Sequence, residues 1–163
     1  MIELSAGEDG TGGIEITAAG SLEATAVGSD VSLTTGADDG DVLLTGSITA
    51  LDQVTVASDA GSVALDGTLS SESLIVTAAG SLTDGDFGDV SVNGLATLSA
   101  AEITLGDSAG NSTNFGSLTF NSAGAVAITE DSSMTVAGPS SAGAGLELSS
   151  AGNMQLSGAI NVV

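Results

Sequence analysis

The sequence predicts an all-β chain wound into a solenoid, in which the short strands of successive coils stack on one another. A small-residue turn, usually Ala-Gly, precedes an apolar-x-apolar triplet, and this combination recurs along almost all of the 163 residues. Gly occupies 24 positions, and helical spacing of the apolar residues never persists, so a helix of any length is not expected. A repeat this short cannot close a core alone, and each copy must bury its apolar side against the next copy.

Nine triplets mark the first set of expected strands. Alternation with a period of two directs the two flanking residues of each triplet inward and the middle residue outward. Successive triplets start roughly 13 to 23 residues apart, which is the length of one β-helix coil carrying two or three short strands. The triplets are Ile14–Ile16, Val31–Leu33, Val54–Val56, Leu74–Val76, Val90–Val92, Ile103–Leu105, Leu118–Phe120, Met134–Val136 and Met154–Leu156.

Four further triplets lie between members of the first set and predict a second strand in their coils. They are Leu22–Ala24, Val63–Leu65, Val126–Ile128 and Leu146–Leu148. About eight coils stacked at about 4.8 Å each would form a rod of roughly 40 Å. Three segments are expected to bulge from the coils as loops: Gly36–Asp41, Asp107–Asn114 and Gly138–Gly145, the last of which contains Pro139, the only proline.

The apolar residues determine the kind of core that this solenoid can have. Hydrophobic residues make up 42% of the chain, mainly Ala, Val, Leu and Ile, with three Phe, three Met and neither Trp nor Tyr. A narrow core of small, often β-branched side chains is therefore expected. No linker or shift in composition divides residues 1–163, which predicts a single β-solenoid domain that forms a segment of a longer repeat protein.

The charge is entirely acidic. The 21 charged side chains are all Asp or Glu, and the chain has no Lys, Arg, His or Cys, so its side chains cannot form salt bridges or disulfides with one another. Nucleic acid is not expected as a partner, because phosphate binding needs Lys or Arg, and anionic membrane surfaces are disfavoured for the same reason. No apolar run approaches the length of a membrane span, and Met1–Leu4 lacks the features of a signal peptide. Either Met1 opens an excised fragment of a larger secreted protein, or the chain is not exported by the signal-peptide route.

The missing residue types exclude most enzyme chemistry. Nucleophilic triads need a base such as His, P-loop phosphate sites need Lys, and structural zinc sites need Cys or His. Paired carboxylates remain, and glycoside hydrolysis uses two of them. Such sites normally add basic or aromatic side chains to hold the sugar, and this chain has no basic residue, Tyr or Trp. An enzyme is therefore not expected.

Clustered acids are the other chemical candidate, because calcium takes six to eight oxygen ligands and Asp-rich turns with Gly can supply them. Besides Glu8-Asp9 and Glu130-Asp131, the chain has two clusters in Gly-containing turns. Since Asp and Gly are also favoured in ordinary solvated turns, this alternative interpretation stays open. The expected calcium ligands are Asp38, Asp39, Asp41, Asp84, Asp86 and Asp89.

The stretch Ala101–Gly138 resembles the repeats of very large bacterial surface proteins of the filamentous-haemagglutinin and autotransporter-passenger type. The resemblance is carried by Ile103–Asp107, Phe115–Phe120 and Ser122–Asp131, and it extends more loosely over residues 14–162. It implies a single-stranded right-handed parallel β-helix within an exported adhesin or surface filament. It implies no site residues, because the repeats carry none that can be matched.

The sequence thus predicts a structural or interaction module of an extracellular bacterial adhesin, stalk or self-assembling surface filament. The alternative is a calcium-dependent binding or cross-linking module that uses the Asp-rich turns, and a carboxylate-only polysaccharide-active enzyme is favoured least. No cofactor other than calcium is expected. Neither Ile2–Leu4 nor Ala159–Val163 resembles a polar cap, so the expected partners are neighbouring repeats or further copies joined end to end. A surface glycan or a host cell-surface molecule is a further expected partner.

Overall fold

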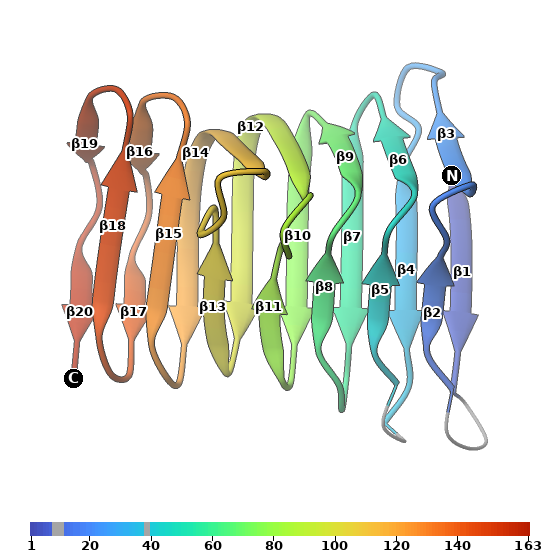
Figure 1. Ribbon diagram of the computed structural model, residues 1–163, viewed down its shortest axis with the longest axis horizontal. Helices are drawn as coiled ribbons and strands as arrows, with labels where there is room; N and C mark the ends of the chain where they lie inside the picture. The colour runs from blue at the N-terminus through green and yellow to red at the C-terminus, as the bar shows by residue number, and fades with distance from the viewer. Residues whose placement is uncertain (8–11, 38–39) are drawn as a thin grey trace.

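A computed structural model describes residues 1–7, 12–37 and 40–163, and within these ranges the chain forms twenty strands and no helix. The strands wind into one β-solenoid in which every pairing between strands is parallel (Figure 1). Figure 1 shows the chain descending the far side through strands such as β4 and β7, ascending the near side through β5 and β8, and advancing from right to left. The coil is therefore right-handed, as parallel crossover connections nearly always are.

Each coil contributes up to three strands, which stack into three ladders. The first ladder contains β1 (Ile2–Ala6), β4 (Val31–Thr35), β7 (Gln53–Ser58), β10 (Ser73–Ala78), the second halves of β12 (Asp89–Ala100) and β14 (Ser112–Ser122), β17 (Ser140–Ala142) and β20 (Ile160–Val162). The second ladder contains β2 (Ile14–Ile16), β5 (Val42–Leu44), β8 (Val63–Leu65), β11 (Ser81–Thr83), β13 (Glu102–Leu105), β15 (Val126–Glu130) and β18 (Leu146–Ser150). The third contains β3 (Ser21–Ala24), β6 (Ser47–Ala50), β9 (Thr68–Ser71), the first halves of β12 and β14, β16 (Met134–Val136) and β19 (Met154–Leu156).

The predicted number of coils is too high. The second ladder stacks seven strands, so about six turns of the solenoid separate its first strand from its last, whereas the sequence predicts about eight coils. Partners in the first ladder are 23 residues apart for Val31 and Val54 and 20 apart for Val54 and Leu74. The spacing between successive triplets in the sequence is often shorter than one coil, because some neighbouring triplets lie on different ladders. Counting each such triplet as a new coil makes the predicted number of coils too high.

The prediction of a loop at Gly138–Gly145 is also wrong in part. Ser140–Ala142 forms β17, which pairs with Asn121 and Ser122 on one side and with β20 on the other. Ser140 and Ala142 point inward and are buried. Ladder hydrogen bonds and burial thus impose a strand on a segment whose composition favours a turn. The loop expected at Asp107–Asn114 is shorter than predicted, since β14 begins at Ser112.

The core is a set of inward columns that run along the axis of the rod. One column of the first ladder consists of Leu33, Val56, Val76, Leu98 and Phe120, each at most 2% exposed. Burying such a side chain stabilises the fold by about 1.5–3 kcal/mol, so stability comes from contacts between coils rather than within one.

Glycine allows the coils to approach closely at the corner before the third ladder. The carbonyl oxygens of Gly20, Gly46 and Gly67 accept hydrogen bonds from the next coil at 3.0, 2.9 and 2.9 Å. A Cβ on Gly67 would lie 2.2 Å from the carbonyl oxygen of Gly46, closer than atoms can pack. This corner therefore requires residues without a side chain.

Candidate functional site

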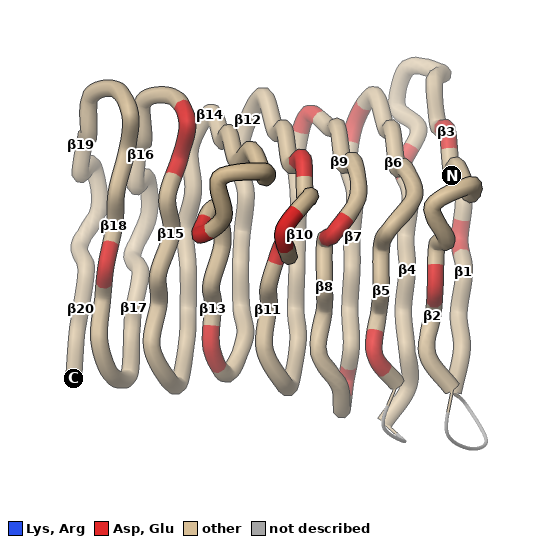
Figure 2. The backbone as a smooth tube through the Cα atoms, viewed as in Figure 1, with Lys and Arg blue, Asp and Glu red and all other residues tan. Residues whose placement is uncertain are grey.

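The acids predicted to bind calcium do not form one site in the described part of the chain. Asp38 and Asp39 lie outside the described residues. Asp41 directly precedes β5, whereas Asp84 directly follows β11. Because the strands of the second ladder are parallel, these two acids lie at opposite ends of its strands (Figure 2). Within residues 1–7, 12–37 and 40–163, no group of three or more acidic side chains is placed to hold a metal ion. The calcium site stays a prediction that depends on the acids outside these ranges.

The described acids instead bind groups of the next coil. Asp41 Oδ1 accepts a hydrogen bond from the backbone N–H of Ser62 at 2.7 Å. Asp86 Oδ1 accepts one from the hydroxyl of Ser108 at 3.0 Å, and Asp89 accepts one from the hydroxyl of Ser112. A carboxylate that receives such bonds helps to fix the spacing of two coils, which is a structural task.

Asp84 is buried in the core, although its place in an Asp-Gly turn predicts a solvated side chain. Leu82 pairs with Val63 and with Ile103, so Asp84, two residues further, falls in the same inward column as Leu65 and Leu105. Its side chain is 0% exposed. An Asp-Gly pair normally indicates a solvated turn, and only the register between coils shows that this Asp points inward.

The hydrogen bonds of Asp84 leave one of its oxygens without a partner. Oδ2 accepts bonds from the backbone N–H of Gly106 at 2.7 Å and from the hydroxyl of Thr113 at 2.9 Å, whereas Oδ1 is buried with no partner among the described residues. Burial raises the pKa of Asp84, the bonds from Gly106 and Thr113 oppose this rise, and the nearby charge of Asp107 adds to it. The folded chain therefore holds the proton of Asp84 more tightly than the unfolded chain does.

Glu130 is a second fully buried acid, at the end of β15. The alternation of Val126, Ile128 and Glu130 places all three side chains inward, and Glu130 is 0% exposed. Its Oε2 accepts a hydrogen bond from the backbone N–H of Phe115 at 3.3 Å, and its Oε1 has no partner among the described residues. Burial raises the pKa of Glu130 from 4.5 to about 7, although the bond from Phe115 opposes the rise.

Glu130 and Asp131 lie where the stacking of the third ladder is interrupted. Strand β16 joins β14 through a single registered pair, Leu118 and Val136, and since Leu118 lies in the second half of β14, no registered pair joins β16 to the first half of β14. The backbone N–H of Thr113 therefore donates to Asp131 Oδ2 at 3.0 Å, and that of Phe115 donates to Glu130. The two carboxylates replace the carbonyl oxygens that a neighbouring strand would supply.

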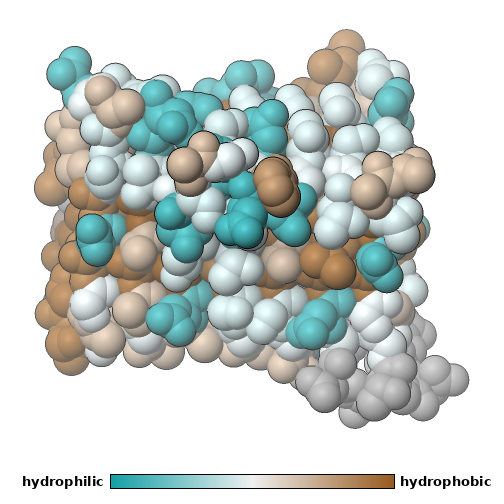
Figure 3. Space-filling view, in the orientation of Figure 1, coloured by the Kyte–Doolittle hydropathy of each residue, from teal (hydrophilic) through white to brown (hydrophobic). Residues whose placement is uncertain are grey.

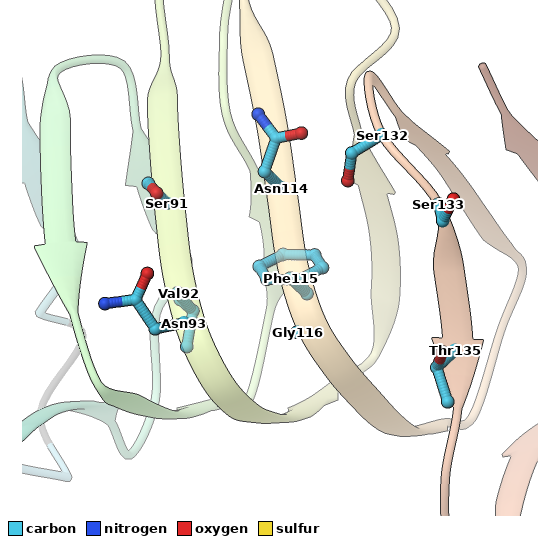
Figure 4. Close-up of a pocket in the computed structure, with 9 residues that line it drawn as sticks. All are labelled: Ser91, Val92, Asn93, Asn114, Phe115, Gly116, Ser132, Ser133 and Thr135. Carbon is cyan, nitrogen blue, oxygen red and sulfur yellow. The ribbon is translucent and has the colours of Figure 1, made fainter. Parts of the chain in front are cut away.

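The interruption opens a shallow groove of about 500 Å³ between β12, β14 and β16 (Figure 4). Its polar lining is neutral and includes Asn93, Asn114 and Ser133, and Phe115 is only 3% exposed there. The groove offers hydroxyl and amide groups but neither a carboxylate nor an exposed aromatic ring. It therefore lacks the acid pair and the sugar platform that polysaccharide hydrolysis uses.

A second hollow of about 490 Å³ lies between the segment that follows β13 and strand β15. Three acids, Asp107, Asp131 and Glu147, line it together with the apolar side chains of Leu105 and Ile128. Because these acids do not converge as a metal-binding group, the hollow can attract cations only diffusely.

No protein-family model, curated protein or solved structure matches this chain. None of the described residues forms a helix of the length and apolar character needed to cross a membrane. The class that the fold defines is thus a right-handed parallel β-solenoid, and no comparison narrows it to a family.

Proposed function

We propose that this chain is a structural and interaction module, a stiff rod within a bacterial surface adhesin, stalk or filament. The observation that carries the proposal is the continuous parallel ladder that joins every coil to the next along the axis. About six turns at about 4.8 Å each give a rod of roughly 30 Å. Each layer is tied to its neighbours by backbone hydrogen bonds and by buried apolar columns.

The position of the acids supports a role without catalysis. Among the described residues, the carboxyl groups with raised pKa are Asp84 and Glu130, and both are 0% exposed, so a dissolved polysaccharide cannot reach them. The neutral groove beside Phe115 contains no acid that could act as a general acid or base. The outer surface instead carries scattered carboxylates, which keep neighbouring rods apart through charge repulsion.

Surface display tests the proposal. The chain is placed between an outer-membrane anchor and an epitope tag on a bacterium, with a Gly-Ser linker of equal residue number as the control. A stiff rod is expected to give more uniform exposure of the tag to antibody-coated beads than the linker. Adhesion of the same bacteria to arrays of glycans and matrix proteins reports whether the module also binds a partner. Tag exposure equal to the linker control together with no adhesion would overturn the proposal.

A further inference from the structure

The groove between β12, β14 and β16 lies within the stack of coils. Strand β12 also pairs with β9, and β16 also pairs with β19, so both walls of the groove belong to stacked coils. No registered pair joins β16 to the first half of β14, and this gap in the third ladder forms the groove. Its volume of about 500 Å³ falls within the range of about 300–1,000 Å³ that is typical of small-molecule sites.

Four polar side chains of the groove have no hydrogen-bond partner in the described part of the chain. Two are Asn amides and two are hydroxyls, and they come from all three strands (Figure 4): Ser91, Asn93, Asn114 and Thr135. None of these side chains donates to or accepts from another group within residues 1–7, 12–37 and 40–163. Because each amide and each hydroxyl can both donate and accept, the groove offers matched hydrogen-bonding groups to a ligand.

The charge of the chain indicates the class of this ligand. With 21 acids and no basic residue, the chain repels an anionic ligand. None of the described residues that line the groove is acidic, so a cationic ligand finds no ion-pair partner there. Figure 3 shows strongly hydrophilic side chains standing apart over β2, β13 and β18, the strands that carry Glu15, Glu102 and Glu147. A cation would bind such exposed acids instead, and the groove favours an uncharged polar ligand.

An extended peptide fits the groove less well than a saccharide does. A peptide that adds a strand to a sheet binds through backbone hydrogen bonds. The backbone N–H of Thr113 already donates to Asp131 Oδ2 at 3.0 Å. The backbone N–H of Phe115 already donates to Glu130 Oε2 at 3.3 Å. A saccharide needs no strand edge, because its hydroxyl groups pair with side-chain amides and hydroxyls.

We infer that this groove binds an uncharged oligosaccharide through Asn93, Asn114 and Thr135. The inference rests on the proposed function of an interaction module and names the class of ligand that the module binds. Phe115 is only 3% exposed, so hydrogen bonds rather than stacking on an aromatic ring hold the sugar. Such a site is expected to bind weakly, with a Kd of about 1 mM.

The experiment is an NMR titration of the whole isotope-labelled chain with three uncharged trisaccharides, namely maltotriose, cellotriose and N-acetylchitotriose. At least one is expected to bind with a Kd of about 1 mM and to shift the amide signals of β16 and the first half of β14. Anionic sialyllactose is expected to bind at least about tenfold more weakly, because the chain repels it.

Asparagine variants locate the site. Asn114→Ala removes one amide from the groove and is expected to raise the Kd at least about threefold. Asn93→Ala, at an exposed side chain, is an independent second variant with the same expected effect. The matched control Asn121→Ala lies on the same strand as Asn114 but outside the groove, and it should leave the Kd unchanged. Circular dichroism checks that all three variants keep their strands.

Three results would overturn the inference: no binding of any of the trisaccharides, effects of Asn114→Ala and Asn93→Ala no larger than that of Asn121→Ala, or signal shifts confined to other coils. A blocked alanine peptide that binds the groove more tightly than the sugars would overturn the class of ligand. None of these results alters tag exposure in the display experiment, so failure of the saccharide site and failure of the structural function remain distinguishable.

Discussion

Glu130→Gln is expected to make the protein more stable at pH 8 and to flatten its dependence on pH. The carboxyl group of Glu130 is buried, one of its oxygens has no partner in the described part of the chain, and burial raises its pKa from 4.5 to about 7. A raised pKa means that the folded chain holds the proton more tightly than the unfolded chain does. The stabilisation from this proton is fully present below pH 4.5 and is lost as the pH rises through 7.

The size of the effect follows from the same two values. The interval between 4.5 and about 7 corresponds to at most about 3 kcal/mol, and partial hydration of the folded site reduces the expected value to about 1–2 kcal/mol. Gln keeps an oxygen that can accept the hydrogen bond from the backbone N–H of Phe115, and it is neutral at every pH.

Urea unfolding between pH 5 and 8 at constant ionic strength measures the free energy of unfolding for both proteins. Glu147→Gln is the matched control, because it removes one exposed negative charge from the strand that pairs with β15. If Glu130→Gln and Glu147→Gln change the pH profile equally, loss of net charge explains the result and the argument from burial is refuted.

Three further predictions concern the contacts between coils. Gly67→Ala should destabilise the fold by about 2 kcal/mol or more, because its Cβ would lie 2.2 Å from the carbonyl oxygen of Gly46. The control Gly145→Ala has open space around its Cβ and should change stability by less than about 1 kcal/mol. Equal thermal melting points of the two variants would contradict this prediction. Asp66 accepts a hydrogen bond from the backbone N–H of Phe87 at 3.1 Å. In chemical unfolding, Asp66→Ala should therefore lower the free energy of unfolding by about 1 kcal/mol more than Asp66→Asn, which retains an acceptor. An Asn variant as unstable as the Ala variant would argue against a stabilising role of this bond. Calcium and magnesium at equal ionic strength should raise the melting temperature equally, because the described acids form no metal-binding group. A rise specific to calcium would favour the calcium-dependent alternative.

The strands with apolar triplets could be predicted from the sequence because their inward residues repeat with the period of a strand. All thirteen predicted triplets lie within strands, from Ile14–Ile16 to Met154–Leu156. Strands rich in Ser, such as Thr68–Ser71 and Ser140–Ala142, were not identified, because pairing with neighbouring coils rather than their own composition makes them strands.

The buried acids illustrate a different limit of sequence interpretation. The alternation of Val126, Ile128 and Glu130 could have placed Glu130 inside, since the acid falls on the inward phase of a recognisable strand. Asp84 offers no such signal, because it follows its strand within an Asp-Gly turn. Its burial depends on the alignment of β11 with β8 and β13, which are distant in sequence.

The absence of basic side chains explains why the carboxylates of this chain so often bind the backbone. With no Lys, Arg or His, the backbone N–H groups are strong donors available at every coil. Asp41, Asp66 and Asp131 each accept a bond from an N–H of an adjacent coil, and Asp84 accepts one from Gly106 in the next coil. Such charge-assisted bonds hold neighbouring coils together even though the same charges repel one another over longer distances. The acidity of the chain thus stabilises the stacking within one rod while opposing side-by-side association of rods.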